Sequence, residues 1–130
     1  MTDFTHLNLA TDVENMAPKF GMPEGMEARF ARRPLGLEKS GVSLFRLPPE
    51  TRVPFGHRHG EQEEVYLVLE GSARMKLEDE IVELGALDAI RVPGEVARGM
   101  EGGPEGAAIV AFGAPNTDNK DAEMLPGWWS

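Results

Sequence analysis

The chain has 130 residues, enough for one domain, and 41% of them are hydrophobic, which is too many for a disordered chain. It contains no cysteine, which excludes disulfides, thiolate metal sites and cysteine nucleophiles. Its formal net charge of −9 would repel phosphate backbones and anionic lipid surfaces, so we expect neither a nucleic-acid nor a membrane partner.

Residues 1–40 predict an N-terminal arm with short helices. The arm begins without the basic and apolar regions of a secretory signal, so we expect a cytoplasmic protein. Residues 12–19 predict one or two helical turns that stop at Phe20-Gly21, and residues 23–33 predict another that ends at Pro34. Met22, Met26 and Phe30 are spaced as one face of that second helix, and we expect this face to pack against the domain.

Short strand-like segments separated by turn residues follow from Gly41 to Gly113. They are rich in β-branched residues or alternate between apolar and polar residues, at 42–47, 64–70, 72–78, 80–84, 88–92 and 107–112. Such a series predicts an all-β sandwich or barrel over residues 41–113. Residues 114–130 form a polar tail that ends in Trp128-Trp129, and these large apolar rings predict that the tail packs on the barrel or on a partner subunit.

One group of residues in the chain carries metal-binding chemistry. His57 and His59 lie at the end of a predicted strand, and side chains two apart on a strand share a face. Glu64 opens the next strand, and it can meet both imidazoles if the two strands are neighbours. Two imidazole nitrogens and one carboxylate can hold a divalent ion with positions left open. The alternation of side chains along a strand does not by itself choose between Glu64 and Glu63.

The spacing from His57-x-His59 to Glu64 and on to Gly71, with the phrase EEVYLVLEG, resembles the first conserved motif of the cupin superfamily. The motif normally opens with a glycine where this chain has Thr51. The resemblance implies a small single-domain cupin, whose barrel is a double-stranded β-helix of jelly-roll type. It also implies that His57, His59 and Glu64 hold a mononuclear iron, manganese, nickel, zinc or copper ion. The spacing to Gly71 favours Glu64 over Glu63 and would turn Tyr66 inward.

The second cupin motif departs from the family pattern, because the histidine that supplies the fourth ligand is missing. Counting from Pro93 places Arg98 at its position, and counting from Gly94 places Ala97 there. Neither side chain can bind a metal cation. Four interpretations follow: three ligands hold a metal with water completing the set; Arg98 pairs with Glu64 in an empty site; Arg98 clamps an acidic ligand; or Arg98 is a surface residue.

The resemblance leaves the activity open, because cupins include dioxygenases, isomerases, decarboxylases, sugar-binding proteins and storage proteins. One hypothesis is a metal-dependent enzyme of dioxygenase or isomerase type, in which Tyr66 and Arg98 place a small-molecule substrate. The alternative is a non-catalytic binding or sensing module with an empty or vestigial metal site, and a third is a structural dimer. We expect a homodimer, because the strand at 64–70 is apolar on both faces and its outward residues Val65, Leu67 and Leu69 need a cover. The cover is the N-terminal arm, a neighbouring subunit, or the arm of a neighbouring subunit exchanged across a two-fold axis.

Overall fold

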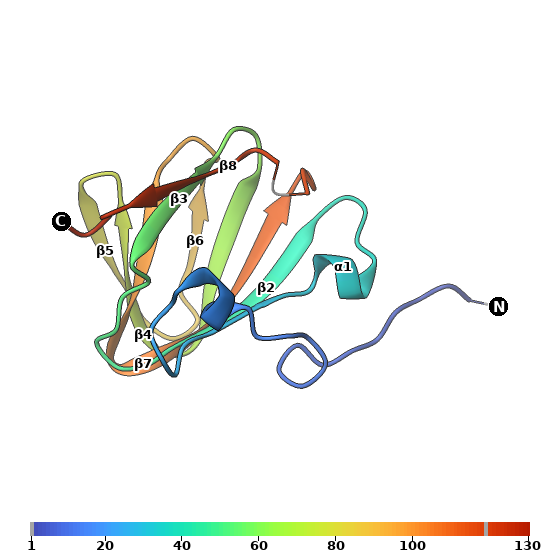
Figure 1. Cartoon of the computed structure of the whole chain (residues 1–130), viewed down its shortest axis with the longest axis horizontal. Coiled ribbons are helices and arrows are strands. Elements are labelled where there is room, and N and C mark those ends of the chain that lie inside the picture. Colours follow the sequence, from blue (N-terminus) through green and yellow to red (C-terminus); the bar gives the residue numbers. More distant parts are fainter. Residues whose placement is uncertain (1, 119) are drawn as a thin grey trace.

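The structure, a computed structural model, describes residues 2–118 and 120–130. Its strands are β1 (Glu27–Phe30), β2 (Gly41–Leu47), β3 (Phe55–His59), β4 (Glu63–Leu77), β5 (Glu80–Leu84), β6 (Ala89–Val92), β7 (Arg98–Ala114) and β8 (Ala122–Pro126). A short 3-10 helix, η1 (Ala17–Phe20), and a short α-helix, α1 (Arg32–Leu35), precede β2. The all-β prediction is confirmed, because the strands curl into one antiparallel barrel (Figure 1).

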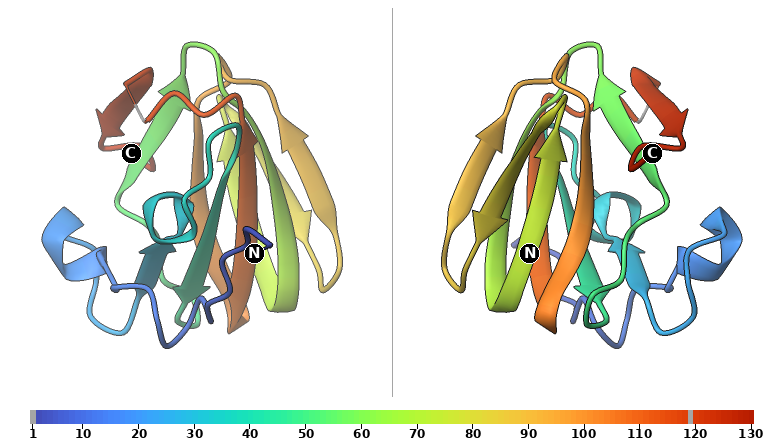
Figure 2. Two further views of the ribbon diagram at one scale, coloured as in Figure 1. Left: turned by 90° about the vertical axis from the view of Figure 1, so that its right-hand side faces the viewer. Right: turned by 90° about the vertical axis from the view of Figure 1, so that its left-hand side faces the viewer.

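Two long strands, β4 and β7, pair with each other and contribute to both walls of the barrel. The first half of β4 lies between β6 and the last part of β7, and β2 and β1 continue that wall. The second half of β4 lies between β5 and the first part of β7, and β3 and β8 continue the other wall. Figure 2 shows the two walls facing each other. The segments predicted as separate strands at 64–70 and 72–78 are therefore one bent strand.

Gly71 lies where β4 bends from one wall into the other, next to shifts in its register with β7. Its φ is 74°, and a Cβ at this position would lie 2.0 Å from the carbonyl oxygen of Gly106. Only glycine fits both the left-handed backbone and the close approach. The sequence predicts a turn at this residue, whereas the structure has a bulge that keeps the strand continuous.

The N-terminal arm differs from its prediction. Residues 23–33, expected to be helical, instead contain β1, which pairs along the edge of β2. A segment at that edge gains a ladder of backbone hydrogen bonds, and this outweighs a weak local helix preference. Met26 is nevertheless buried, and Met22 and Phe30 pack against the core. No helix among the described residues is both long and apolar enough to span a membrane.

The strands present one face to the barrel interior and the other to the outside. On β4, Tyr66 and Val68 point inward and are buried, with Ile109 of β7 beside them in the core. The outward side chains are less covered, since Leu69 is 41% and Phe112 is 46% exposed. The outer face of β4 and β7 is therefore partly apolar and partly open, as the alternation along the sequence predicts.

The C-terminal segment extends the barrel wall that contains β3. Strand β8 pairs with β3 (Figure 1). The chain then turns so that Trp128 lies against two glycines. A Cβ at Gly56 or Gly99 would come within 2.7 Å or 2.4 Å of the Trp128 ring. The Trp128 indole donates a hydrogen bond to the carbonyl of Lys76, and the Trp129 indole donates one to the carbonyl of Val53. Both indole N–H groups are thus paired within the chain.

Candidate functional site

The structure brings His57, His59 and Glu64 together, one ligand atom of each lying within 4.8 Å of the others. The two histidines come from β3, where they share the inward face, and Glu64 comes from the start of β4. Glu64 Oε1 lies 3.4 Å from His57 Nε2 and 3.3 Å from His59 Nε2. The Tyr66 hydroxyl donates a hydrogen bond of 2.7 Å to the same oxygen. Glu63 points away, 60% exposed and 3.7 Å from Arg91.

Burial and hydrogen bonding together set the protonation of this cluster. Burial lowers the pKa of His57 and outweighs the attraction of Glu64, so His57 is neutral at neutral pH. For His59, burial also acts to lower the pKa, but Glu64 and Asp121 raise it more. Burial acts to raise the pKa of Glu64, yet its contacts with His57, His59 and Tyr66 hold that pKa well below its usual range. Glu64 is therefore an ionised carboxylate inside the barrel.

Asp121 lies directly behind His59, which the sequence analysis did not foresee. His59 Nδ1 lies 3.2 Å from Asp121 Oδ1, and the Thr117 hydroxyl donates to the same oxygen at 2.6 Å. Asp121 Oδ2 accepts hydrogen bonds from the backbone N–H groups of Glu61 and Gln62, both at 2.9 Å. Asp121 follows His59 by 62 residues in the sequence, so no local spacing could have indicated this contact.

Arg98 enters the site from the opposite side of Glu64. It opens β7, where it pairs in register with His57, and its side chain is 0% exposed. Its Nη1 lies 3.5 Å from Glu64 Oε1, and its Nη2 donates to the carbonyl of Pro93 at 2.9 Å. Arg98 Nε and Nη1 are buried without a hydrogen-bond partner. The interpretation of Arg98 as a surface residue is wrong, because the side chain is fully buried.

A cavity of about 590 Å³ opens above this cluster. Its floor carries His57, Glu64 and Tyr66, and its rim carries charged groups of the arm and the tail. The walls are mainly aromatic and thioether side chains, including Phe20, Phe30, Phe45, Phe55, Met22 and Met100. Arg98 is not among the lining residues, and its contact with a ligand stays a prediction. The size and the apolar walls are typical of small-molecule sites.

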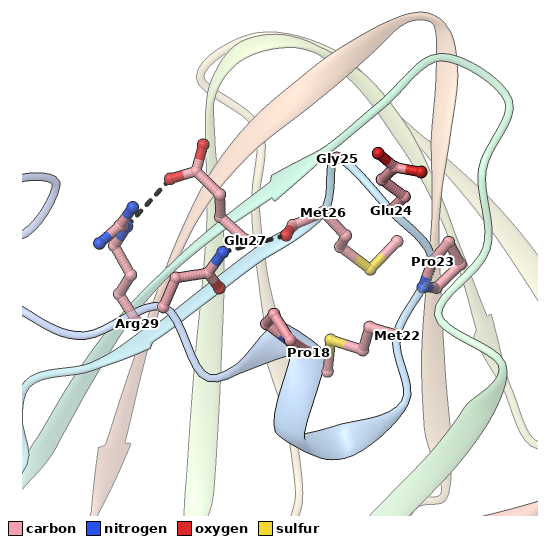
Figure 3. A pocket seen from close by; sticks show the side chains of 9 residues that line it. Pro18, Met22, Pro23, Glu24, Gly25, Met26, Glu27 and Arg29 are labelled. Carbon is pink, nitrogen blue, oxygen red and sulfur yellow. Dashed lines mark hydrogen bonds and ion pairs between the residues drawn. The ribbon is translucent and has the colours of Figure 1, made fainter.

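A second hollow, of about 540 Å³, lies between η1 and β1 on the N-terminal arm. The side chains of Met22 and Met26 extend into it (Figure 3). Two of its charged groups are occupied with each other, since Arg29 pairs with Glu27 at 2.9 Å. This hollow therefore offers apolar surface without the convergent polar groups found on the floor of the barrel.

Comparison by sequence finds no matching family model and no matching curated protein. Comparison of structures finds many similar folds. A cupin protein from Bacteroides fragilis is 22% identical with a TM-score of 0.72, and the match covers 90% of this chain and 88% of that one. A variant of the Streptomyces protein PAC13, in a structure with uridine, is 18% identical with a TM-score of 0.74 over 98% and 93% of the two chains.

A variant of oxalate decarboxylase from Bacillus subtilis is 23% identical with a TM-score of 0.73, and the match covers 88% of this chain and 31% of that longer one. The chain has the cupin fold. Within this barrel, His57, His59 and Glu64 lie around one point, and Arg98 pairs in register with His57.

The cupin ligand set present here fits a divalent metal in its donors and spacing. Ligand atoms about 2.1 Å from one ion lie roughly 3.0–3.5 Å from their neighbours, and the separations of both imidazoles from Glu64 Oε1 fall in this range. A neutral His57 and an ionised Glu64 are in the protonation states that metal binding requires, whereas the raised pKa of His59 opposes it. The buried charge of Arg98 opposes a second cation, so we expect the site to hold metal more weakly than a four-ligand cupin.

Proposed function

We propose that the protein binds a small organic molecule in the cupin cavity, at a mononuclear divalent-metal site formed by His57, His59 and Glu64. The observation that carries this proposal is the convergence of these ligand atoms on the floor of an otherwise apolar cavity. The resemblance in fold to a PAC13 structure that contains uridine supports a small-molecule ligand. The nitrogen and oxygen donors suit iron, manganese, nickel, zinc or copper.

Each polar residue has a distinct part in this proposal. A bound divalent ion would act as a Lewis acid at the floor of the cavity. Tyr66, whose hydroxyl donates to Glu64 at 2.7 Å, holds the carboxylate in place and presents its oxygen to the ligand. Arg98 supports Glu64 from behind through the ion pair at 3.5 Å. The apolar walls exclude water from the floor, and this strengthens every polar contact made there.

The test is the metal content of protein purified without an affinity tag, measured by elemental analysis. We expect a stoichiometric divalent metal in the wild type and loss of most of it in His57→Ala, His59→Ala and Glu64→Gln. Glu63→Gln is the matched control, because Glu63 is adjacent in sequence but points outward. Loss of metal from Glu63→Gln with retention in Glu64→Gln would reverse the assignment, and metal that is unaffected by every variant would place the site elsewhere.

A second candidate function is a metal-free binding or sensing module, and the position of Arg98 favours it. Its buried guanidinium already supplies a positive charge next to Glu64, which is the charge that a metal would otherwise bring. Wild-type protein without metal that still binds its ligand, with Arg98→Ala abolishing that binding, would select this function over the metal-dependent one.

We also propose that the protein works as a homodimer through the outer face of β4 and β7. Leu69 and Phe112 are both more than two-fifths exposed on that face, and Leu67 between them is only half-buried. Pairing this face with its copy across a two-fold axis would remove it from water, which is the usual fate of such a surface. The core of the barrel covers only the inward side chains of β4, so the cover for its outer face has to come from outside the barrel.

A further inference from the structure

The clearest built feature that the proposed function does not use is the contact between His59 and Asp121. His59 is nearly inaccessible, with its side chain 4% exposed, and both of its ring nitrogens face carboxylates. Nε2 lies 3.3 Å from Glu64 Oε1, and Nδ1 lies 3.2 Å from Asp121 Oδ1. An ionised carboxylate can only accept hydrogen bonds, so each of these acids competes for a proton on His59.

Asp121 is held more firmly than an ordinary acidic side chain. Its carboxylate accepts hydrogen bonds from the Thr117 hydroxyl and from the backbone amides of Glu61 and Gln62, and its Oδ1 also lies 3.2 Å from His59 Nδ1. Its own backbone carbonyl accepts a further hydrogen bond from Gly60 at 3.1 Å. These contacts from two directions give the carboxylate a fixed position next to His59.

We infer that Asp121 is a positioning residue that keeps a proton on His59 Nδ1 and thereby leaves Nε2 as the nitrogen that turns its lone pair toward the site. A ring nitrogen can bind a metal or accept a hydrogen bond only when it carries no proton, and the partner of the other nitrogen decides which one that is. Without Asp121, the remaining acceptor is Glu64, which would draw the proton of a neutral His59 onto Nε2 and block it. In the wild type, Asp121 therefore makes the C-terminal segment part of the site formed by β3 and β4.

The variant Asp121→Asn makes the sharpest test because it keeps the shape of the side chain. The backbone N–H groups of Glu61 and Gln62 need an oxygen at the Oδ2 position, so the new amide oxygen should face the loop. Its NH₂ group should then face His59 Nδ1 and donate to it. The proton of a neutral His59 should move to Nε2. We therefore expect this variant to reverse the tautomer of His59 without loosening the packing around it.

The matched control is Thr117→Val, which removes the other side-chain hydrogen bond to Asp121 Oδ1 without touching His59. The readout is the ¹⁵N spectrum of the histidine side chains, which distinguishes a protonated from an unprotonated ring nitrogen. His59 is assigned by comparison with His59→Gln, and His6 is exposed and serves as an internal reference. We expect a protonated Nδ1 in the wild type and in Thr117→Val, and an unprotonated Nδ1 in Asp121→Asn.

Titration with Zn²⁺ in a non-chelating buffer provides the second readout. We expect Asp121→Asn to weaken binding about 10- to 100-fold, in line with other residues that orient metal ligands, and Thr117→Val to change it much less. An unchanged His59 spectrum in Asp121→Asn, or an equal effect of Thr117→Val, would overturn the inference. The inference rests on the proposed metal site only for the titration: a wild type that binds no Zn²⁺ would reject the proposed function, while the spectra would still decide the role of Asp121.

Discussion

Replacing Arg98 with methionine tests whether a buried cation takes part in holding the site together. The change removes the guanidinium whose Nη1 lies 3.5 Å from Glu64 Oε1 and leaves that carboxylate in the interior. Removing one partner of a buried ion pair costs about 3–5 kcal/mol. The variant also regains part of this free energy, because it removes Arg98 Nε and Nη1, two polar atoms that are buried without hydrogen bonds. Each unsatisfied group costs the wild type at least about 1 kcal/mol, so removing both reduces the net loss of stability to about 1–3 kcal/mol.

The exposed pair of Arg91 and Glu63 provides the matched control for this measurement. Its atoms lie 3.7 Å apart, but both side chains are more than half exposed, so Arg91→Met should cost less than about 0.5 kcal/mol. The double variant Arg98→Met/Glu64→Gln removes both buried charges together and should recover most of the loss. Unfolding by urea, followed by far-UV circular dichroism in the presence of a chelator, gives the free energy of unfolding without a contribution from metal.

Two results would refute this reasoning. If Arg98→Met costs no more than Arg91→Met, then Arg98 is not paired in the interior of the folded protein. If the double variant is as unstable as the sum of its two single changes, then Arg98 and Glu64 are not coupled. Either result would also remove the reason to expect that Arg98 opposes a metal ion.

Three further predictions concern metal affinity, acid stability and assembly. Arg98→His should raise divalent-metal affinity at least tenfold by restoring a fourth ligand, and Arg98→Met should raise it less because it only removes repulsion, which calorimetric titration can measure; equal affinities would place Arg98 away from the ion. Burial raises the pKa of Glu101, but its ion pairs with Arg52 and Arg74 outweigh this and lower it. The ionised Glu101 therefore stabilises the fold above its unfolded pKa and loses this contribution as the pH falls through its folded pKa. Glu101→Gln should cost about 1–2 kcal/mol of stability at neutral pH and little in acid, which urea unfolding at both pH values would measure. Light scattering should find a dimer that Phe112→Asp converts to a monomer, and a wild type of 14.2 kDa at every concentration would contradict the proposed homodimer.

The sequence predicts the barrel and the inward face of its central strand because both depend on local patterns. The spacing from Glu64 to Gly71 fixes which side chains of β4 point inward, and the structure buries Tyr66 accordingly. The motif also narrows the position of the missing histidine to Arg98 or Ala97, since the count can start at Pro93 or at Gly94. These features require only alternation along a strand and the position of a turn.

Other features depend on contacts between distant segments, which local patterns do not encode. The segment 27–30 becomes a strand because the edge of β2 is available to it, and nothing in its own residues favours that state over a helix. Asp121 reaches His59 only because β8 pairs with β3, and the sequence shows no more than a tail that should pack somewhere. The burial of Arg98 depends on its register with His57, which the spacing alone leaves open.

The packing of Trp128 against Gly56 and Gly99 has a spectroscopic consequence. The chain has two tryptophans, at positions 128 and 129, so its indole fluorescence originates entirely in the last few residues. Emission would therefore report whether the tail is docked on β3 and β7, while circular dichroism reports the strands of the barrel. If the tail detaches first, the two signals will change at different denaturant concentrations, and the unfolding of this small barrel will fail the usual test for a single cooperative transition.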